Sequence, residues 1–125
     1  MILKGEDVKL VLLKINNGSI VGNRPMQYDF CIRSNFGEEL GFCRLIVNIS
    51  DKHGKFEFRI KDNKYLLEVL NLIKDFCEST HSMFYILISY SNRLESIKEI
   101  LSSAGFTVLY KYTEDSTYKF SFREC

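Results

Sequence analysis

The end of one predicted helix constrains this sequence more than any other feature. Asn92 and Glu95 have the spacing of a capping box, and apolar residues then recur at helical intervals. Ala104-Gly105-Phe106 places a glycine where a left-handed helix terminator belongs. Residues 83–89, just before this helix, are almost continuously apolar, which is typical of a strand covered on both faces. The second half of the chain therefore predicts a buried strand followed by a capped helix.

The rest of the chain predicts further strands and one more helix. Turn residues such as Asp51-Lys52-His53-Gly54 separate segments with an extended pattern. Over residues 56–61 the apolar side chains fall on one face and the charged side chains on the other. The period changes to 3.6 over residues 64–78, where Asp62 or Asn63 is placed to cap the helix start. The predicted strands are residues 8–15, 28–33, 40–49, 56–61, 83–89, 106–113 and 117–123.

Length and charge exclude several classes of protein. The chain has 125 residues, which suits one globular domain over residues 1–125 with its own core. Seventeen Lys and Arg against sixteen Asp and Glu leave a net charge of +1, so neither nucleic acid nor an anionic membrane is expected as a partner. No apolar run approaches the ~20 residues that cross a bilayer, and Lys4 interrupts the start where a signal peptide would be apolar. We expect a cytoplasmic protein.

The cysteines and histidines do not predict a metal site. The four cysteines lack any Cys-x-x-Cys spacing, so buried free thiols are expected at Cys31, Cys43, Cys77 and Cys125. His53 lies in a turn and His81 lies before a predicted strand, so both are expected at the surface. Because no Gly-x-Ser-x-Gly elbow is present, a serine nucleophile is not indicated either.

The order of these elements resembles the GNAT superfamily of acyl-CoA N-acyltransferases over most of the chain. Ser103-Ala104-Gly105-Phe106 is similar to the family's helix that ends in Gly-Phe before its sixth strand, and Leu40-Gly41-Phe42 is similar to the start of its third strand. The resemblance implies an α/β (α+β) fold with a mixed, mostly antiparallel sheet of six to seven strands, a central parallel strand-helix-strand crossover and two main helices. It implies acetyl-CoA as cofactor, no metal, and the amine of a small molecule or peptide as acceptor.

The cofactor site departs from the family's pattern. Family members hold the pyrophosphate of acetyl-CoA on a Gln/Arg-x-x-Gly-x-Gly/Ala loop, whose glycines let backbone N–H groups approach the phosphates. The matching joint, Ile60 to Leu66, is shorter and has no glycine. Asp62 at the helix start would occupy the same N–H groups and repel a phosphate. The resemblance leaves these cofactor-binding candidates: Phe58, Arg59, Ile60, Lys61, Lys64 and Asn92.

The catalytic residues also depart from the pattern. By its position on the fourth of the family's strands, Glu57 is the candidate general base that would deprotonate the amine. The alternative for Glu57 is a solvent-facing strand residue paired with a cross-strand Arg or Lys. The Tyr that reprotonates the coenzyme A thiolate in many family members is replaced by Leu101, which has no proton to donate. For Asn92 the alternative to contacting the pantetheine arm is capping the helix together with Glu95.

Three hypotheses follow, and whether the chain is an enzyme stays open among them. The first is an N-acetyltransferase with an altered cofactor loop. The second is a catalytically inactive ligand-binding or protein-interaction module of the same fold, for example a homodimer joined through edge strands or the last hairpin. The third is an unrelated α/β domain with the same order of elements. The short connection from Asn16 to Gln27 predicts an open or incomplete acceptor pocket.

Overall fold

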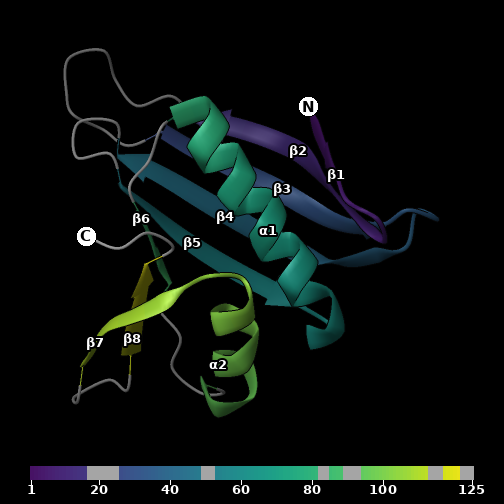
Figure 1. Cartoon of the computed structure of the whole chain (residues 1–125). Coiled ribbons are helices and arrows are strands. Elements are labelled where there is room, and N and C mark those ends of the chain that lie inside the picture. Colours follow the sequence, from purple (N-terminus) through teal and green to yellow (C-terminus); the bar gives the residue numbers. More distant parts are fainter. Residues whose placement is uncertain (17–25, 49–52, 82–84, 89–93, 113–116, 122–125) are drawn as a thin grey trace, which may run out of the picture.

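The computed structural model describes residues 1–16, 26–48, 53–81, 85–88, 94–112 and 117–121 (Figure 1). Its strands are β1 (Ile2–Lys4), β2 (Val8–Asn16), β3 (Met26–Ser34), β4 (Glu39–Asn48), β5 (His53–Ile60), β6 (Tyr85–Ile88), β7 (Thr107–Tyr112) and β8 (Thr117–Ser121). Its helices are α1 (Leu66–Phe76) and α2 (Leu94–Ser103), with a 3-10 turn η1 (Asn63–Tyr65) before α1 and a π-helical turn η2 (Cys77–His81) after it. The predicted class, mixed α and β with a mostly antiparallel sheet and two helices, is confirmed. β1 was not predicted.

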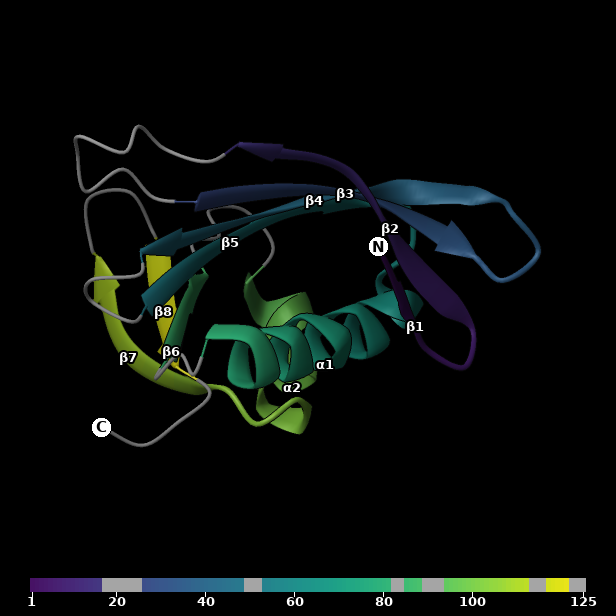
Figure 2. The ribbon, with the colours of Figure 1, turned by 90° about the horizontal axis from the view of Figure 1, so that it is seen from above.

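The main sheet contains six strands in the order in which they follow along the chain. Neighbouring strands from β1 to β5 run antiparallel, whereas β5 and β6 run parallel with α1 between them in sequence. Parallel neighbours need such a crossover because a tight turn can join only antiparallel strands. In the described part of the chain β7 and β8 hydrogen-bond to each other as a second sheet. β8 lies beside β6 (Figures 1 and 2).

The core lies between the main sheet and α1. The helix buries Leu66, Val69, Leu70 and Ile73 completely, which is the stripe that a 3.6-residue period places on one face. Across from this stripe the sheet buries aromatic and aliphatic side chains, and Phe76 packs edge-on against Tyr28 with ring centroids 5.1 Å apart. Figure 2 shows α1 and α2 on the same side of the main sheet. Neither of these two helices therefore covers the other face of the main sheet.

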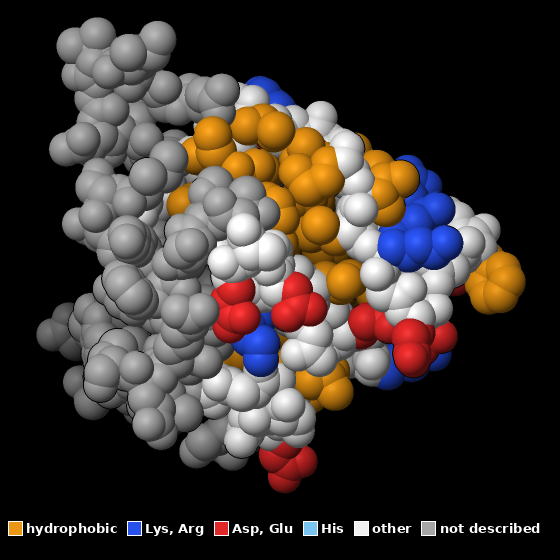
Figure 3. Space-filling view, turned by 45° about the horizontal axis from the view of Figure 1, so that its top comes forward, with side chains coloured by type: hydrophobic (Ala, Val, Ile, Leu, Met, Phe, Trp, Pro, Cys, Tyr) orange, Lys and Arg blue, Asp and Glu red, His pale blue; other side chains and the backbone are white. Residues whose placement is uncertain are grey.

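The edge of this core is partly open to solvent. Figure 3 shows hydrophobic side chains at the surface with acidic and basic side chains beside them. The partly buried hydrophobic residues that pack on the core are Leu3, Leu12, Met26, Phe58, Ile60, Tyr65, Leu72 and Ile100. No helix among the described residues is both long enough and apolar enough to cross a membrane.

The predicted end of the second helix is confirmed. The Phe106 N–H donates to the Leu101 carbonyl at 2.9 Å and the Gly105 N–H donates to the Ser102 carbonyl at 3.0 Å, which together form a Schellman motif. Gly105 has φ +87°, a conformation that L side chains rarely adopt. Lys74 of α1 donates from Nζ to the Ala104 carbonyl at 2.8 Å, so a cation from one helix caps the carboxyl end of the other. Asn92 lies outside the described residues, so its capping box stays a prediction.

A carboxylate on α1 holds the turn between β1 and β2. Glu68 accepts hydrogen bonds from the backbone N–H groups of Glu6 at 2.7 Å, Asp7 at 3.0 Å and Val8 at 2.7 Å. A Cβ added at Gly5 would lie 2.8 Å from Glu68 Cδ, so the carboxylate needs a residue without a side chain there. This contact joins the first turn of the chain to the central helix.

The inner cysteines are buried free thiols, as predicted. Cys31, Cys43 and Cys77 are buried and form no disulfide. Burial, together with the charge of Glu78, raises the pKa of the Cys77 thiol to about 12. Burial also raises the pKa of Cys43, so neither of these thiols is a reactive thiolate near neutral pH. Cys125 lies outside the described residues.

Candidate functional site

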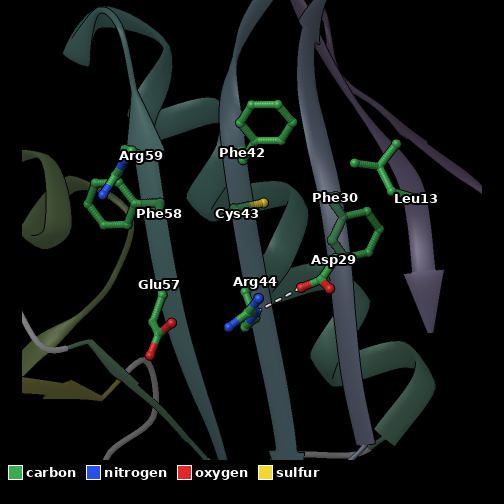
Figure 4. A pocket seen from close by; sticks show the side chains of 9 residues that line it. All are labelled: Leu13, Asp29, Phe30, Phe42, Cys43, Arg44, Glu57, Phe58 and Arg59. Carbon is green, nitrogen blue, oxygen red and sulfur yellow. Dashed lines mark hydrogen bonds and ion pairs between the residues drawn. The ribbon is translucent and has the colours of Figure 1, made fainter. Parts of the chain in front are cut away.

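A hollow of about 570 Å³ lies on the face of the main sheet opposite α1. Figure 4 views this outer face directly, with the strands in front of the helix. Among the described residues both helices cover the other face (Figure 2), and the side chains of Leu13 and Phe42 in the hollow are exposed, whereas Phe30 and Cys43 at its floor are buried. The residues that line the hollow are Leu13, Asp29, Phe30, Phe42, Cys43, Arg44, Glu57, Phe58 and Arg59.

Strand alternation decides which side chains reach this face. On β5 the Glu57 and Arg59 side chains are exposed, whereas Phe56 is buried and Phe58 is partly buried, which confirms the predicted division of this strand. The register sets Glu57 opposite Arg44 of β4 and Arg59 opposite Phe42. Asp29 of β3 lies opposite Arg44 on the other side. A row of charged side chains therefore crosses β3, β4 and β5.

Asp29 and Arg44 form the ion pair at the centre of this row. Arg44 Nε donates to Asp29 Oδ1 at 2.9 Å, and Gln27 Nε2 donates to Asp29 Oδ2 at 3.2 Å (Figure 4). Burial raises the pKa of the Asp29 carboxyl, but the hydrogen bonds from Arg44 and Gln27 and the charges of Arg44 and Lys14 outweigh it and lower that pKa below its ordinary value. Asp29 is consequently ionised at neutral pH, and its carboxylate oxygens already accept hydrogen bonds from Arg44 and Gln27.

Glu57, the candidate base, lies inside the hollow but is already paired. Its Oε1 lies 3.4 Å from Lys55 Nζ, and the two side chains are 46% and 49% exposed. The ion pair runs along β5, between residues two apart on one face, rather than across to β4. The alternative for Glu57 is a solvent-facing strand residue paired with a cross-strand Arg or Lys; Glu57 is half-exposed and paired, but with Lys55 of its own strand. The role of Glu57 as a base stays a prediction.

Next to this hollow, β5 extends beyond the last residue that it pairs with β6 in the described part of the chain. The last residue of β5 that pairs with β6 is Phe56, opposite Ile88, although β5 continues to Ile60. The Lys61 N–H donates to the Leu40 carbonyl at 2.9 Å, so alternation turns the backbone groups of Phe58 and Ile60 toward the β6 side. Beyond Phe56 no strand in the described part of the chain pairs with that edge. An extended, amide-containing ligand could pair with it.

The start of α1 lacks an open phosphate cradle. Asp62 Oδ1 accepts the Lys64 N–H at 2.9 Å, as the sequence predicted for a capping carboxylate. Lys64 Nζ lies 3.9 Å from Asp62 Oδ2, and both the Lys61 and Lys64 side chains are exposed. A pyrophosphate would meet a carboxylate at this corner instead of backbone N–H groups. The geometry at this corner therefore fits a pyrophosphate poorly.

Leu101, at the position of the family's catalytic Tyr, lies away from the hollow. Leu101 is fully buried in the core near α1, and Asn92 lies outside the described residues. His53 begins β5 and His81 ends η2. The connection over residues 17–25, on which the expected open acceptor pocket depends, also lies outside the described residues.

Sequence reasoning missed the charged row itself. The sequence analysis assigns no role to Asp29 or Arg44, and it names Arg59 only as a cofactor-binding candidate. The available signal was weak, because a charged residue at an outward strand position looks the same with or without a partner. Only the register between β3, β4 and β5 brings these side chains together.

The sequence matches no protein-family model and no curated protein. Solved structures do match. A spermidine N-acetyltransferase from Vibrio cholerae, solved with CoA and spermine, is 13% identical with a TM-score of 0.67, covering 76% of this chain and 63% of that chain. A protein from Sphaerobacter thermophilus DSM 20745 named as an acetyltransferase is 12% identical with a TM-score of 0.68, covering 97% of this chain and 94% of that chain.

A third structure, from Vibrio cholerae and named as a ribosomal-protein-serine acetyltransferase, is 9% identical with a TM-score of 0.68 and covers 97% of this chain and 95% of that chain. The chain thus spans less than two thirds of the spermidine acetyltransferase and nearly all of the other two. These neighbours are GNAT-family acetyltransferases, so the chain has the GNAT fold. At such low identity the likeness shows the fold alone.

Proposed function

We propose that this protein is a GNAT-fold N-acyltransferase that uses acetyl-CoA and acts on the amine of a small molecule or peptide. The observation that carries the proposal is that, among the described residues, the pairing of β5 with β6 ends at Phe56 whereas β5 itself continues to Ile60. Backbone groups of Ile60, the last residue of β5, pair with an amide group of the pantetheine arm. The outer-face hollow, which begins on the other side of the same strand, receives the acceptor amine.

Within this proposal each described residue has a separate task. When bound, acetyl-CoA supplies an acyl thioester that an uncharged amine can attack. Glu57 takes the proton from that amine, which requires the acceptor to displace Lys55 from the carboxylate. Lys61 and Lys64 provide positive charge near the phosphates in place of a glycine loop. Asn92 contacts the pantetheine arm. Leu101 donates no proton, so the leaving thiolate is protonated by solvent.

A second candidate function is supported by the corner at Asp62. Because the Asp62 carboxylate accepts the Lys64 N–H, coenzyme A loses the backbone contacts that its phosphates need. A catalytically inactive ligand-binding or protein-interaction module of the same fold explains this loss and the buried Leu101 together. This alternative retains the fold and the outer-face hollow but not the transfer reaction.

A thermal-shift experiment with the full chain separates these functions. Acetyl-CoA at 100 times its dissociation constant should stabilise the protein by ~2.7 kcal/mol. Mass spectrometry of a mixture of amines and dipeptides should then reveal an acetylated product, and Glu57→Gln should lower its formation by about 10²–10⁴-fold with the thermal shift unchanged. Stabilisation without any product supports the inactive module. No shift at millimolar acetyl-CoA contradicts both acetyl-CoA binding and the transferase.

Three further features stay predictions. They are a single domain over residues 1–125, a cytoplasmic location and a homodimer. One of the structural neighbours, the spermidine N-acetyltransferase from Vibrio cholerae, is dodecameric, which makes self-association worth measuring. Size-exclusion chromatography with light scattering tests this point directly.

A further inference from the structure

Of the cations that line the hollow on the outer face, Arg59 is the one that pairs with no residue in the described part of the chain. Arg44 is paired with Asp29 at 2.9 Å, and Glu57 is paired with Lys55 at 3.4 Å. Arg59 forms no hydrogen bond or ion pair with any residue that the structure describes. Its guanidinium is exposed at the rim of the hollow (Figure 4). The charge that remains for a ligand is therefore positive.

Apolar side chains lie beside this cation. Phe42 is directly opposite Arg59 on β4 and is 48% exposed, and Leu13 of β2 is 57% exposed on the far side of the hollow. Large apolar side chains this exposed in a hollow are typical of a ligand-binding surface. A guanidinium presents a planar fork of donors that matches a carboxylate with two parallel hydrogen bonds. The surface thus suits a ligand with one carboxylate and an apolar body.

The spacing along β5 adds an amine to this ligand. Glu57 and Arg59 lie two residues apart on the same face of the strand, a separation of roughly 6–7 Å at the usual rise per residue. An extended dipeptide separates its amino group from its carboxylate by about the same distance, since consecutive Cα atoms are ~3.8 Å apart. In a single α-amino acid the two groups are too close to reach both side chains.

We propose that the outer-face hollow binds a dipeptide-sized amino carboxylate, with the carboxylate on Arg59, the amino group toward Glu57 and an apolar side chain against Phe42 and Leu13. The inference rests on the proposed function in one respect, because it names the acceptor of that same site. Polyamines are disfavoured, since they carry no group for Arg59 and their positive charges meet Arg44, Arg59 and Lys55.

Binding can be measured without acetyl-CoA. Isothermal titration calorimetry of the full chain should give saturable binding of glycyl-leucine and at least tenfold weaker binding of glycyl-leucine amide and of spermidine. Arg59→Gln should weaken glycyl-leucine binding at least tenfold and abolish the difference between the acid and the amide. Arg33→Gln is the matched control, because Arg33 bonds the Gly37 carbonyl at the far end of β3 and lies outside the hollow. Circular dichroism checks that both variants fold.

The outcomes separate this inference from the proposed function. Equal affinity for glycyl-leucine and its amide, tighter binding of spermidine, or an Arg59→Gln variant that binds like the wild type would overturn the inference. Failure of glycyl-leucine to bind overturns it as well, although acetyl-CoA could still stabilise the protein and preserve the transferase. Binding of glycyl-leucine without any effect of acetyl-CoA supports the inference and removes the transferase.

Discussion

Two carboxylates on opposite faces of the sheet show how differently this molecule uses charge. Glu68 accepts three backbone N–H groups of the β1–β2 turn, and each of these donors would otherwise need water. Glu57, in the outer-face hollow, has a half-exposed lysine as its recorded partner. A charge satisfied by backbone donors stabilises a turn, whereas the half-exposed Glu57 lies beside Arg59, which pairs with no described residue, and both are available to a ligand. The comparison predicts large stability effects at Glu68 and small ones in the hollow.

The largest effect is expected from Glu68→Ala. Removing the carboxylate leaves the N–H groups of Glu6, Asp7 and Val8 without their acceptor, so the free energy of unfolding should fall by about 2–3 kcal/mol. Urea denaturation measures this change. Glu39→Ala is the control, since Glu39 is an exposed glutamate on β4 that forms no ion pair with any residue the structure describes. Equal stability of the two variants would show that the Glu68 contact does not hold the turn.

Gly5→Ala tests the same contact from the other side. The added Cβ would lie 2.8 Å from Glu68 Cδ and should push the carboxylate off its donors, which costs about 1–2 kcal/mol. Because the clash requires the carboxylate, the effect should nearly vanish in a Glu68→Ala background. A double-mutant cycle measures this coupling. Additive effects would mean that Gly5 is needed for another reason.

The Asp29–Arg44 pair should show a smaller effect that depends on pH. The pKa of Asp29 is lowered in the folded protein, so its contribution to stability is present above the ordinary value of 3.8 and disappears as the pH falls through the lowered value. Asp29→Asn should therefore be less stable than the wild type by less than about 1 kcal/mol at pH 7, with the difference shrinking below pH 3.8. Thermal unfolding across this range measures it. A difference in stability that grows as the pH falls would mean that the ionised Asp29 carboxylate does not stabilise the folded protein.

Arg59→Gln should have the smallest effect on stability. Since no described residue pairs with the guanidinium, the free energy of unfolding should change by less than about 0.5 kcal/mol. Urea denaturation of Arg59→Gln and Glu68→Ala under the same conditions measures the smallest and the largest expected change in the free energy of unfolding. A loss above 1 kcal/mol would mean that Arg59 serves the fold and would weaken its assignment to a ligand.

Local signals in the sequence predicted the local parts of the structure. The helix end at Gly105, the capping role of Asp62 and the alternation of β5 each depend on residues within a few positions of one another. The order of the predicted strands and helices along the chain then carried the resemblance to the GNAT superfamily. The strand β1 was not predicted, because a strand of three residues is too short to show a recognisable alternation.

Long-range contacts could not be predicted in this way. Glu68 is separated from Glu6 by 62 positions, and on a helical pattern it looks like any solvent-facing charge. The Asp29–Arg44 pair depends on a register that the hairpin turn alone determines. Arg59 is distinctive only because its neighbours are already paired, which is a property of the assembled face and of no single residue.

In β5 the strand geometry separates contacts made by the backbone, which substitutions leave in place, from contacts made by side chains, which substitutions change. Glu57 and Arg59 turn their backbones toward β4 and their side chains to the outer face, whereas Phe58 and Ile60 turn their backbones toward the β6 side. Under the proposed function acetyl-CoA is bound by backbone N–H and C=O groups, which every amino acid has. The acceptor is bound by the side chains of Glu57 and Arg59, which a single substitution can replace. A lineage could therefore exchange one acceptor for another at positions 57 and 59 while inheriting the donor's binding edge intact.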